Sequence, residues 1–258
     1  MKQMMKRVIN LVLAILANIW YRFPSRKITL IGITGSNCRE ATALYSHAIL
    51  LQTSKNVGLI TPSKQTIISD YIPDHLKVNS DVPNPFKLQR LLRELVYRGC
   101  KYGILTVSAE SLHEKRLWGC NFTVTVLTNY NHQSGYFDSN EQHLHAKSKL
   151  FTKTPLVVLN KDDPSYSFLS RLTQGKRITY GIKNEAQIKA AKIQNGSWGS
   201  FFYYTNKESV WKNQLSIDRS IKLQDKNLDV VPCALAAIGI AAALNIPEFR
   251  IKKGLESV

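Results

Sequence analysis

Residues 28–42 read ITLIGITGSNCREAT, and this stretch decides the fold. An apolar run at 28–31 leads into the glycine-containing segment 32–37, and a segment with apolar residues at helical spacing follows Glu40. A strand, a tight loop and a helix N-terminus in this order form a phosphate cradle, because backbone N–H groups and the helix dipole face the anion. We therefore predict a nucleotide-type phosphate loop at residues 34–40.

The tip of this loop departs from the usual phosphate-binding residues. A functional P-loop carries Gly-Lys-Ser/Thr at the helix entrance, where the lysine reaches the phosphates and the hydroxyl binds Mg²⁺. Cys38, Arg39 and Glu40 occupy these places here. Arg39 is either a substitute cation or, as we favour, an exposed arginine in a degraded loop. Glu40 is either a metal ligand or an acidic residue of the kind preferred at helix N-termini. Cys38 should crowd the phosphate path, since glycine allows a closer approach.

Strand-like runs alternate with helical segments along the rest of the chain. Further strands are expected at 56–60, 102–107, 122–127, 155–159 and 177–180, and helices at 86–97, 141–151, 166–173, 232–244 and 247–255. Residues 61–84 are polar and irregular, whereas residues 190–222 alternate in the manner of antiparallel strands. The pattern predicts an α/β fold: a P-loop NTPase-like, doubly wound, mainly parallel sheet with a small antiparallel addition near the C-terminal third.

The chain is strongly basic. Its 258 residues suffice for one large α/β core, and the formal net charge is +17. This charge indicates either anionic partners or a lysine-rich proteome. The basic residues are scattered, which argues against a nucleic-acid-binding arm. The four cysteines have no metal-ligand spacing, so neither a zinc site nor a disulfide framework is indicated, and a reducing cytoplasm is the simplest location.

Residues 1–24 begin with basic residues and continue as an apolar run, 8–20. The run is shorter than the about 20 apolar residues of a membrane-spanning helix. No small-residue cleavage site follows, which argues against a signal peptide. We favour a helix that lies on the protein's own surface or on a membrane interface, with Trp20, Tyr21 and Phe23 at the boundary, and intramolecular packing as the preferred alternative.

Several blocks of the sequence resemble the central ATPase domain of the Mur ligases, most closely the UDP-N-acetylmuramoyl-tripeptide synthetase branch. The family's loop Thr-Gly-Thr-Asn-Gly-Lys-Thr corresponds to residues 34–40. Further matching blocks, in the family's order, lie at 83–92, 107–112, 116–119, 128–129, 146–147, 160–164 and from 232 onward. On this resemblance, residues 25–258 form a central domain, and the family's N-terminal UDP-binding domain and its C-terminal domain are not expected within the chain.

The resemblance implies an ATP-dependent ligase of peptidoglycan precursor synthesis, which phosphorylates a carboxylate of a UDP-linked muramoyl peptide before an amine displaces the phosphate. It implies ATP and Mg²⁺ as cofactors. Lys147, the lysine that the family carbamylates, and Asn129 take catalytic positions, and Glu40 and Lys147 take metal positions. Ser108 and Arg116 would contact the sugar-linked substrate. The cofactor-binding residues are Thr34, Gly35, Ser36, Asn37, Cys38, Arg39 and Glu40.

Other positions depart from the family pattern. Thr106 and Glu110 stand in the places of an acidic metal ligand and a histidine, and the segment 130–136, which contains His132, is one residue short. We therefore rank first a Mur-ligase-like protein with impaired or lost catalysis that acts as a binding or partner module. A split or minimal ligase that works with a protein supplying the other domains ranks second. A basic polyanion-binding or membrane-surface protein ranks third, with nucleic acid the less favoured polyanion.

Overall fold

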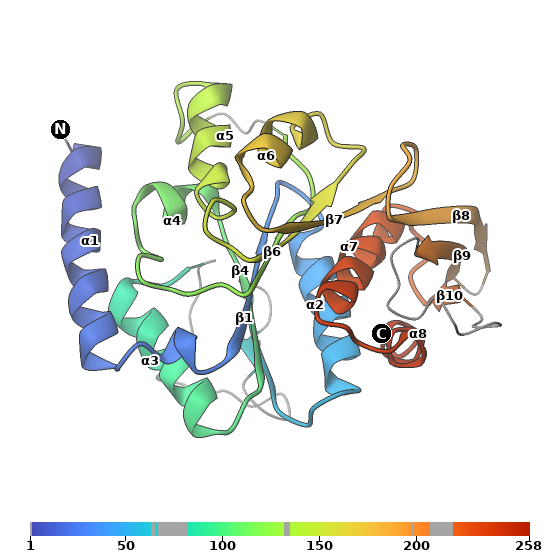
Figure 1. The fold of residues 1–258 in the computed structure, drawn as a ribbon, viewed down its shortest axis with the longest axis horizontal. Coiled ribbons are helices and arrows are strands. Elements are labelled where there is room, and N and C mark those ends of the chain that lie inside the picture. The colour runs from blue at the N-terminus through green and yellow to red at the C-terminus, as the bar shows by residue number, and fades with distance from the viewer. Residues whose placement is uncertain (1, 63–64, 67–81, 132–134, 198, 207–218) are drawn as a thin grey trace.

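The computed structural model describes residues 2–62, 65–66, 82–131, 135–197, 199–206 and 219–258. Within these residues a single sheet of ten strands has the order β10-β9-β8-β7-β6-β5-β1-β4-β2-β3 (Figure 1). The strands are β1 Thr29–Thr34, β2 Val57–Ile60, β3 Gln65–Thr66, β4 Tyr102–Thr106, β5 Val124–Leu127, β6 Leu156–Asn160, β7 Lys176–Gly181, β8 Ile188–Gly196, β9 Gly199–Asn206 and β10 Ser220–Leu223.

The central strands pair in parallel. β1 lies between β4 and β5, with Ile31 opposite Ile104 on one side and Val124 on the other. The parallel order continues outward through β2 on one side and through β6, β7 and β8 on the other. β9 and β10 are antiparallel additions at one edge and β3 at the other. The predicted mainly parallel α/β sheet with an antiparallel C-terminal addition is therefore confirmed.

Helices cover both faces of the sheet, so each central strand is buried on both sides. In β1, Ile31 and Ile33 join one apolar core with α2, α7 and α8, whereas Leu30 joins the opposite core with α3 and α6. Successive side chains of a strand point to opposite faces, which explains the continuous apolar run of β1. The helices are α1 Lys2–Trp20, α2 Arg39–Leu51, α3 Pro85–Tyr97, α4 Ala109–His113, α5 Asn140–Ser148, α6 Tyr166–Leu172, α7 Val230–Ala243 and α8 Glu248–Leu255, with a 3₁₀ turn, η1, at Pro24–Arg26.

Polar residues at helix starts explain several of these boundaries. The side chain of Asn84 accepts a hydrogen bond from the Lys87 N–H at 2.9 Å, and Pro85 occupies the first turn of α3. Ser139 accepts from the Gln142 N–H at 3.2 Å at the start of α5. Both satisfy an N–H that has no partner within its helix.

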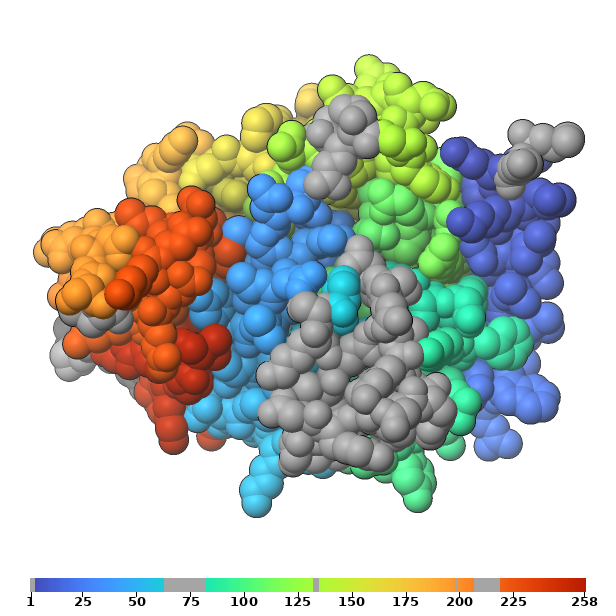
Figure 2. Space-filling view, turned by 180° about the vertical axis from the view of Figure 1, so that it is seen from behind, coloured from blue at the N-terminus to red at the C-terminus, as the bar shows by residue number. Residues whose placement is uncertain are grey.

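α1 lies outside the helical layer that contains α3, at one end of the molecule (Figures 1 and 2). Ala14, Ala17 and Asn18 are buried on its inner side. The Asn18 amide donates to the Trp118 carbonyl at 2.8 Å and thereby fastens α1 to the segment after α4. None of the described helices combines the length and apolar character needed to cross a membrane.

Two features differ from the sequence expectations. The short helix α4 lies in residues for which we expected no element, because five residues are too few for a helical period to be visible. β3 interrupts the segment 61–84 that we expected to be irregular, and most of that segment lies outside the described residues.

Candidate nucleotide site

The loop between β1 and α2 lies at the carboxyl end of the central strand of the sheet. Thr34 ends β1, and α2 begins at Arg39. β5, the neighbour of β1, also ends at this edge, and Thr128 and Asn129 follow it directly. In open α/β sheets ligands bind in the crevice outside the carboxyl ends of the strands, so this is the expected place for a ligand.

Asn129 occupies the inner side of the loop. Its side-chain oxygen accepts hydrogen bonds from the Ser36 N–H at 3.1 Å and the Asn37 N–H at 2.7 Å. The backbone oxygen of Asn129 also accepts from the Ser36 N–H at 3.2 Å. Phosphate loops bind their anion with backbone N–H groups of this kind. Two such groups of this loop are therefore already bonded to the chain's own asparagine.

Thr128 holds the loop from the same side. Its hydroxyl donates to the Asn37 carbonyl at 2.6 Å. A Cβ at Gly35 would overlap this hydroxyl oxygen, so the close approach of loop and strand requires glycine at this position. Cys38 has a φ of 66°, in the left-handed region that favours glycine. The loop backbone thus keeps a glycine-type conformation at Cys38 although the residue carries a side chain.

The structure corrects our expectation for the cysteines. Cys38 and Cys233 form a disulfide, with their Cα atoms 5.4 Å apart and a sequence separation of 195. Cys233 lies on α7, so the bond ties the phosphate loop to this helix, and the Cys38 sulfur lies 3.7 Å from the Asp229 carbonyl oxygen. Disulfides persist mainly in oxidising compartments. The cytoplasmic location inferred from cysteine content therefore loses that support.

Lys147, on α5, contacts the loop from above the sheet edge. It is buried, with its Nζ 3.4 Å from the Ser36 hydroxyl and 5.4 Å from the centre of the Tyr130 ring. Burial and, after it, the positive charge of Arg39 lower the pKa of Lys147 to about 8. Lys147 and Arg39 therefore place two mutually repelling cations beside the loop, and a substantial fraction of Lys147 is neutral at mildly alkaline pH.

The acidic residues near the loop do not form a metal-binding cluster. Among the described residues, no group of three or more histidine, cysteine, aspartate or glutamate side chains could hold a metal ion. Asp163 accepts from the Tyr130 N–H at 2.6 Å and from the Ser165 N–H at 2.9 Å, so it orders its own turn. Thr106 is buried, and within the described residues its hydroxyl oxygen has no hydrogen-bond partner. The predicted metal position Glu40 lies in the first turn of α2.

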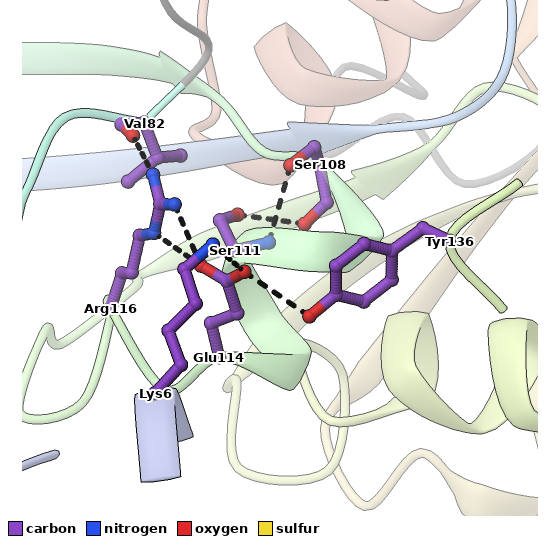
Figure 3. A network of polar contacts seen from close by, with 7 residues as sticks. All are labelled: Lys6, Val82, Ser108, Ser111, Glu114, Arg116 and Tyr136. Atoms are coloured by element: carbon purple, nitrogen blue, oxygen red, sulfur yellow. Dashed lines mark hydrogen bonds and ion pairs between the residues drawn. The ribbon is translucent and has the colours of Figure 1, made fainter. Parts of the chain in front are cut away.

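The two predicted substrate contacts, Ser108 and Arg116, belong to a separate network (Figure 3). Ser108 caps α4 by accepting from the Ser111 N–H at 3.3 Å. Arg116 donates through Nε to Glu114 at 2.7 Å and through Nη1 to the Val82 carbonyl at 3.0 Å. Glu114 also binds Lys6 of α1 at 2.6 Å and accepts from the Tyr136 hydroxyl at 3.1 Å.

The sequence reasoning missed Glu114, which is buried at the centre of this network. Burial alone would raise the pKa of Glu114, but the hydrogen bonds and charges of Lys6 and Arg116 outweigh it and lower the pKa. The sequence signal for a buried charge at Glu114 was weak, because an acidic and a basic residue side by side, here Glu114 and Lys115, are typical of a solvated surface. Thus the loop residues Thr34–Glu40, Asn129 and Lys147 come together, whereas the contacts of Ser108 and Arg116 lie within the network of Figure 3. His132 lies outside the described residues.

This phosphate loop at the carboxyl edge of a parallel sheet defines a P-loop-type α/β protein. Residues 33–240 match the family model described as the Mur ligase middle domain, and the chain belongs to that family. It is 33% identical over 249 residues to the UDP-N-acetylmuramoyl-L-alanyl-D-glutamate–2,6-diaminopimelate ligase of Caldanaerobacter subterraneus subsp. tengcongensis, covering 95% of this chain and 49% of that protein. It is 29% identical to the ligase of the same name from Bacillus licheniformis, covering 95% of this chain and 50% of that protein.

Solved structures show the same fold. A structure of a UDP-N-acetylmuramoyl-L-alanyl-D-glutamate–2,6-diaminopimelate ligase superposes with a TM-score of 0.78 at 18% identity, over 90% of this chain and 46% of that one. The Mycobacterium tuberculosis folylpolyglutamate synthase complexed with ADP superposes with a TM-score of 0.74 at 13% identity, over 96% of this chain and 62% of that one. The chain spans about half the length of the curated relatives it matches.

The residues of the loop do not fit a magnesium-bound triphosphate well. Asn129 already accepts from the N–H groups of Ser36 and Asn37, and no metal-binding cluster is found in the part of the chain that the structure describes. Glu40 places an acidic residue in the first turn of α2, in the place of the P-loop Ser/Thr, and Arg39 stands in the place of the P-loop lysine. We therefore derive no phosphoryl-transfer step from this site.

Proposed function

We propose that this chain is a Mur ligase middle domain with impaired phosphoryl transfer, which serves as a binding or partner module. The observation that supports this most is that Cys38, Arg39 and Glu40 stand in place of the P-loop Gly-Lys-Ser/Thr, because this removes the lysine and hydroxyl that act on phosphate and Mg²⁺. The side-chain oxygen of Asn129, a residue that the chain shares with the family, accepts from the loop amides of Ser36 and Asn37 and shapes the loop.

The ligand class we propose is a nucleotide or a UDP-linked muramoyl peptide. Its basis is the similarity of the chain to ligases of UDP-N-acetylmuramoyl-L-alanyl-D-glutamate, among them those of Caldanaerobacter subterraneus and Bacillus licheniformis. The loop would offer such a ligand the cation of Arg39 and the N-terminal end of α2. Contacts of Ser108 and Arg116 with the sugar-linked part remain predictions.

Calorimetric titration with ATP, with and without Mg²⁺, tests the proposal on the full chain. We expect weak binding that Mg²⁺ does not strengthen. Rebuilding the loop in a triple variant, Cys38→Gly, Arg39→Lys and Glu40→Thr, should strengthen Mg-ATP binding about 10-fold or more, since a charge-assisted hydrogen bond contributes about 1.5–3 kcal/mol. Cys38→Gly alone is the matched control for loss of the disulfide. Micromolar Mg-ATP binding by the natural chain that Arg39→Ala abolishes would overturn the proposal.

A second candidate, a split or minimal ligase that works with a partner protein, is favoured by Lys147. A neutral amine attacks CO₂ to give a carbamate and release a proton, and the lowered pKa of Lys147 makes the neutral amine available near pH 8. The carbamate would supply a metal-binding oxygen. A ¹³C-bicarbonate NMR signal that Lys147→Met removes, together with ATP-dependent ligation after addition of a separate Mur C-terminal domain, would support this candidate over the first.

A further inference from the structure

α1 presents most of its large apolar side chains away from the protein. We call these side chains the outer face; each is about half or more exposed, from 49% for Val12 to 76% for Trp20: Met4, Met5, Val8, Ile9, Val12, Leu16, Ile19 and Trp20. The opposite side of the helix packs inward through small or amide residues such as Ala14, Ala17 and Asn18. A surface helix normally buries its apolar face. This reversed arrangement indicates that the outer face meets another apolar phase.

A basic pocket lies at the C-terminal end of α1. It is a cavity of about 590 Å³ whose wall includes aromatic side chains and four cations: Phe23, Trp118, Phe122, Arg26, Lys115, Lys149 and Lys153. None of the described residues that line it is acidic. The hydrogen bond from Asn18 to the Trp118 carbonyl fixes one wall of this basic pocket against α1. An apolar cavity with several cations is suited to an anionic head group with an apolar body.

The cations of the basic pocket lack acidic partners within the described part of the chain. The ion pairs recorded there do not include Arg26, Lys115, Lys149 or Lys153, and Arg26 instead stacks over the Phe23 ring at 4.4 Å. Burial, followed by the charges of Arg7 and Lys115, lowers the pKa of Lys149. The Nε of Arg7 is buried and finds no hydrogen-bond partner among the residues that the structure describes. These like charges repel one another until an anion neutralises them.

We propose that the outer face of α1 and the basic pocket together dock this protein onto the surface of an anionic lipid bilayer. The outer face enters the boundary between head groups and acyl chains, and the cations of the basic pocket bind a lipid phosphate. The composition of the helix end favours lipid over a protein partner. Exposed Arg22 lies among the aromatic residues Trp20, Tyr21 and Phe23, and the basic residues Arg26 and Lys27 follow. α1 has no acidic residue, so nothing on it repels anionic lipid.

Co-sedimentation of the full chain with vesicles tests this proposal. We expect binding to vesicles of equal parts phosphatidylcholine and phosphatidylglycerol, and weaker binding to phosphatidylcholine alone. Leu16→Ser with Ile19→Ser should abolish most binding to both. Lys149→Gln with Lys153→Gln should weaken binding only to the anionic vesicles, by about fivefold for each cation removed.

Matched controls lie away from α1, on α8 and directly after β7 (Figure 1). Phe249 is 66% exposed on α8, so Phe249→Ser removes a comparable apolar side chain without touching the outer face. Lys183→Gln with Lys253→Gln removes the same charge from exposed positions outside the basic pocket. Circular dichroism confirms that each variant is folded.

The outcomes separate lipid from other occupants. Equal loss of vesicle binding in the control variants overturns the proposal, since positive charge or apolar surface anywhere on the chain would then account for the binding. Absence of vesicle binding also overturns the proposal. The basic pocket then binds only inorganic phosphate if calorimetry shows that binding. The outer face is then a dimer interface if light scattering shows a dimer that Leu16→Ser with Ile19→Ser dissociates. Inorganic phosphate in roughly fifty-fold excess over lipid is added at constant ionic strength. If the chain stays bound to the vesicles, the anion that the basic pocket binds is a lipid phosphate and not the free ion.

Discussion

Glu114→Gln removes one negative charge from the network in Figure 3 and keeps the size of the side chain. The carboxylate of Glu114 is 2% exposed and contacts Lys6 and Arg116, each at 2.6 Å. Removing one partner of a buried ion pair costs about 3–5 kcal/mol. Because the Lys6 and Arg116 side chains are 54% and 26% exposed and regain water, we expect a loss of about 2–3 kcal/mol in the free energy of unfolding.

Urea denaturation of the full chain measures this loss, and a thermal scan should show a Tm lowered by about 4–12 °C. The matched control is Glu94→Gln. Glu94 binds Arg98 at the same 2.6 Å, but with side chains 26% and 33% exposed. A partly exposed pair one helical turn apart contributes only about 0.5 kcal/mol, so the control should lose little. Equal losses in the two variants would refute the argument that burial decides the contribution.

The difference in the free energy of unfolding between the natural chain and Glu114→Gln depends on pH, with a defined sign. The folded-state pKa of Glu114 is lowered below the ordinary value of 4.5. Its stabilising contribution is therefore complete above the pKa of the unfolded chain and is lost as the pH falls through the lower folded-state pKa. The gap between the natural chain and Glu114→Gln should close in strongly acidic buffer. A gap that widens there would contradict the assignment.

Three further predictions concern the loop. Because the pKa of Lys147 is lowered to about 8, the folded chain loses the Lys147 ammonium proton at a lower pH than the unfolded chain does. The free energy of unfolding, relative to that of Lys147→Met, should therefore rise as the pH increases above 8. A difference between the two proteins that does not change with pH contradicts this. Thiol titration of the denatured, unreduced chain should find two of four cysteines free, and reductant should destabilise the natural chain by about 2–5 kcal/mol but leave Cys233→Ala unaffected. Gly35→Ala should cost about 1–3 kcal/mol by overlap with Thr128, and less in a Thr128→Ala background.

Much of the fold follows from local sequence pattern. The apolar run of β1 predicts a strand buried on both faces, and the alternation of such runs with helical segments predicts the parallel sheet. These signals are local, since each depends on residues a few positions apart. The antiparallel addition at β9 and β10 was visible in the same way, from the alternating aromatic residues.

The contacts that define the site are not local. Asn129 reaches the loop from 92 residues away, and Cys38 meets Cys233 across 195 residues because α2 packs against α7. No spacing rule predicts such a pair, because the distance depends on how two helices pack. Glu114 likewise became recognisable as a buried charge only once α1 was seen to place Lys6 beside it.

The hydrogen bonds that Asn129 accepts from the loop have a consequence for how an anion would bind there. In a phosphate loop whose N–H groups are free, water or the bound anion accepts their hydrogen bonds. Here the side-chain oxygen of Asn129 accepts them instead. The turn is therefore shaped before any ligand is present. A phosphate could bind these N–H groups only by displacing the asparagine oxygen, and its affinity would measure the difference in free energy between these two hydrogen-bond acceptors.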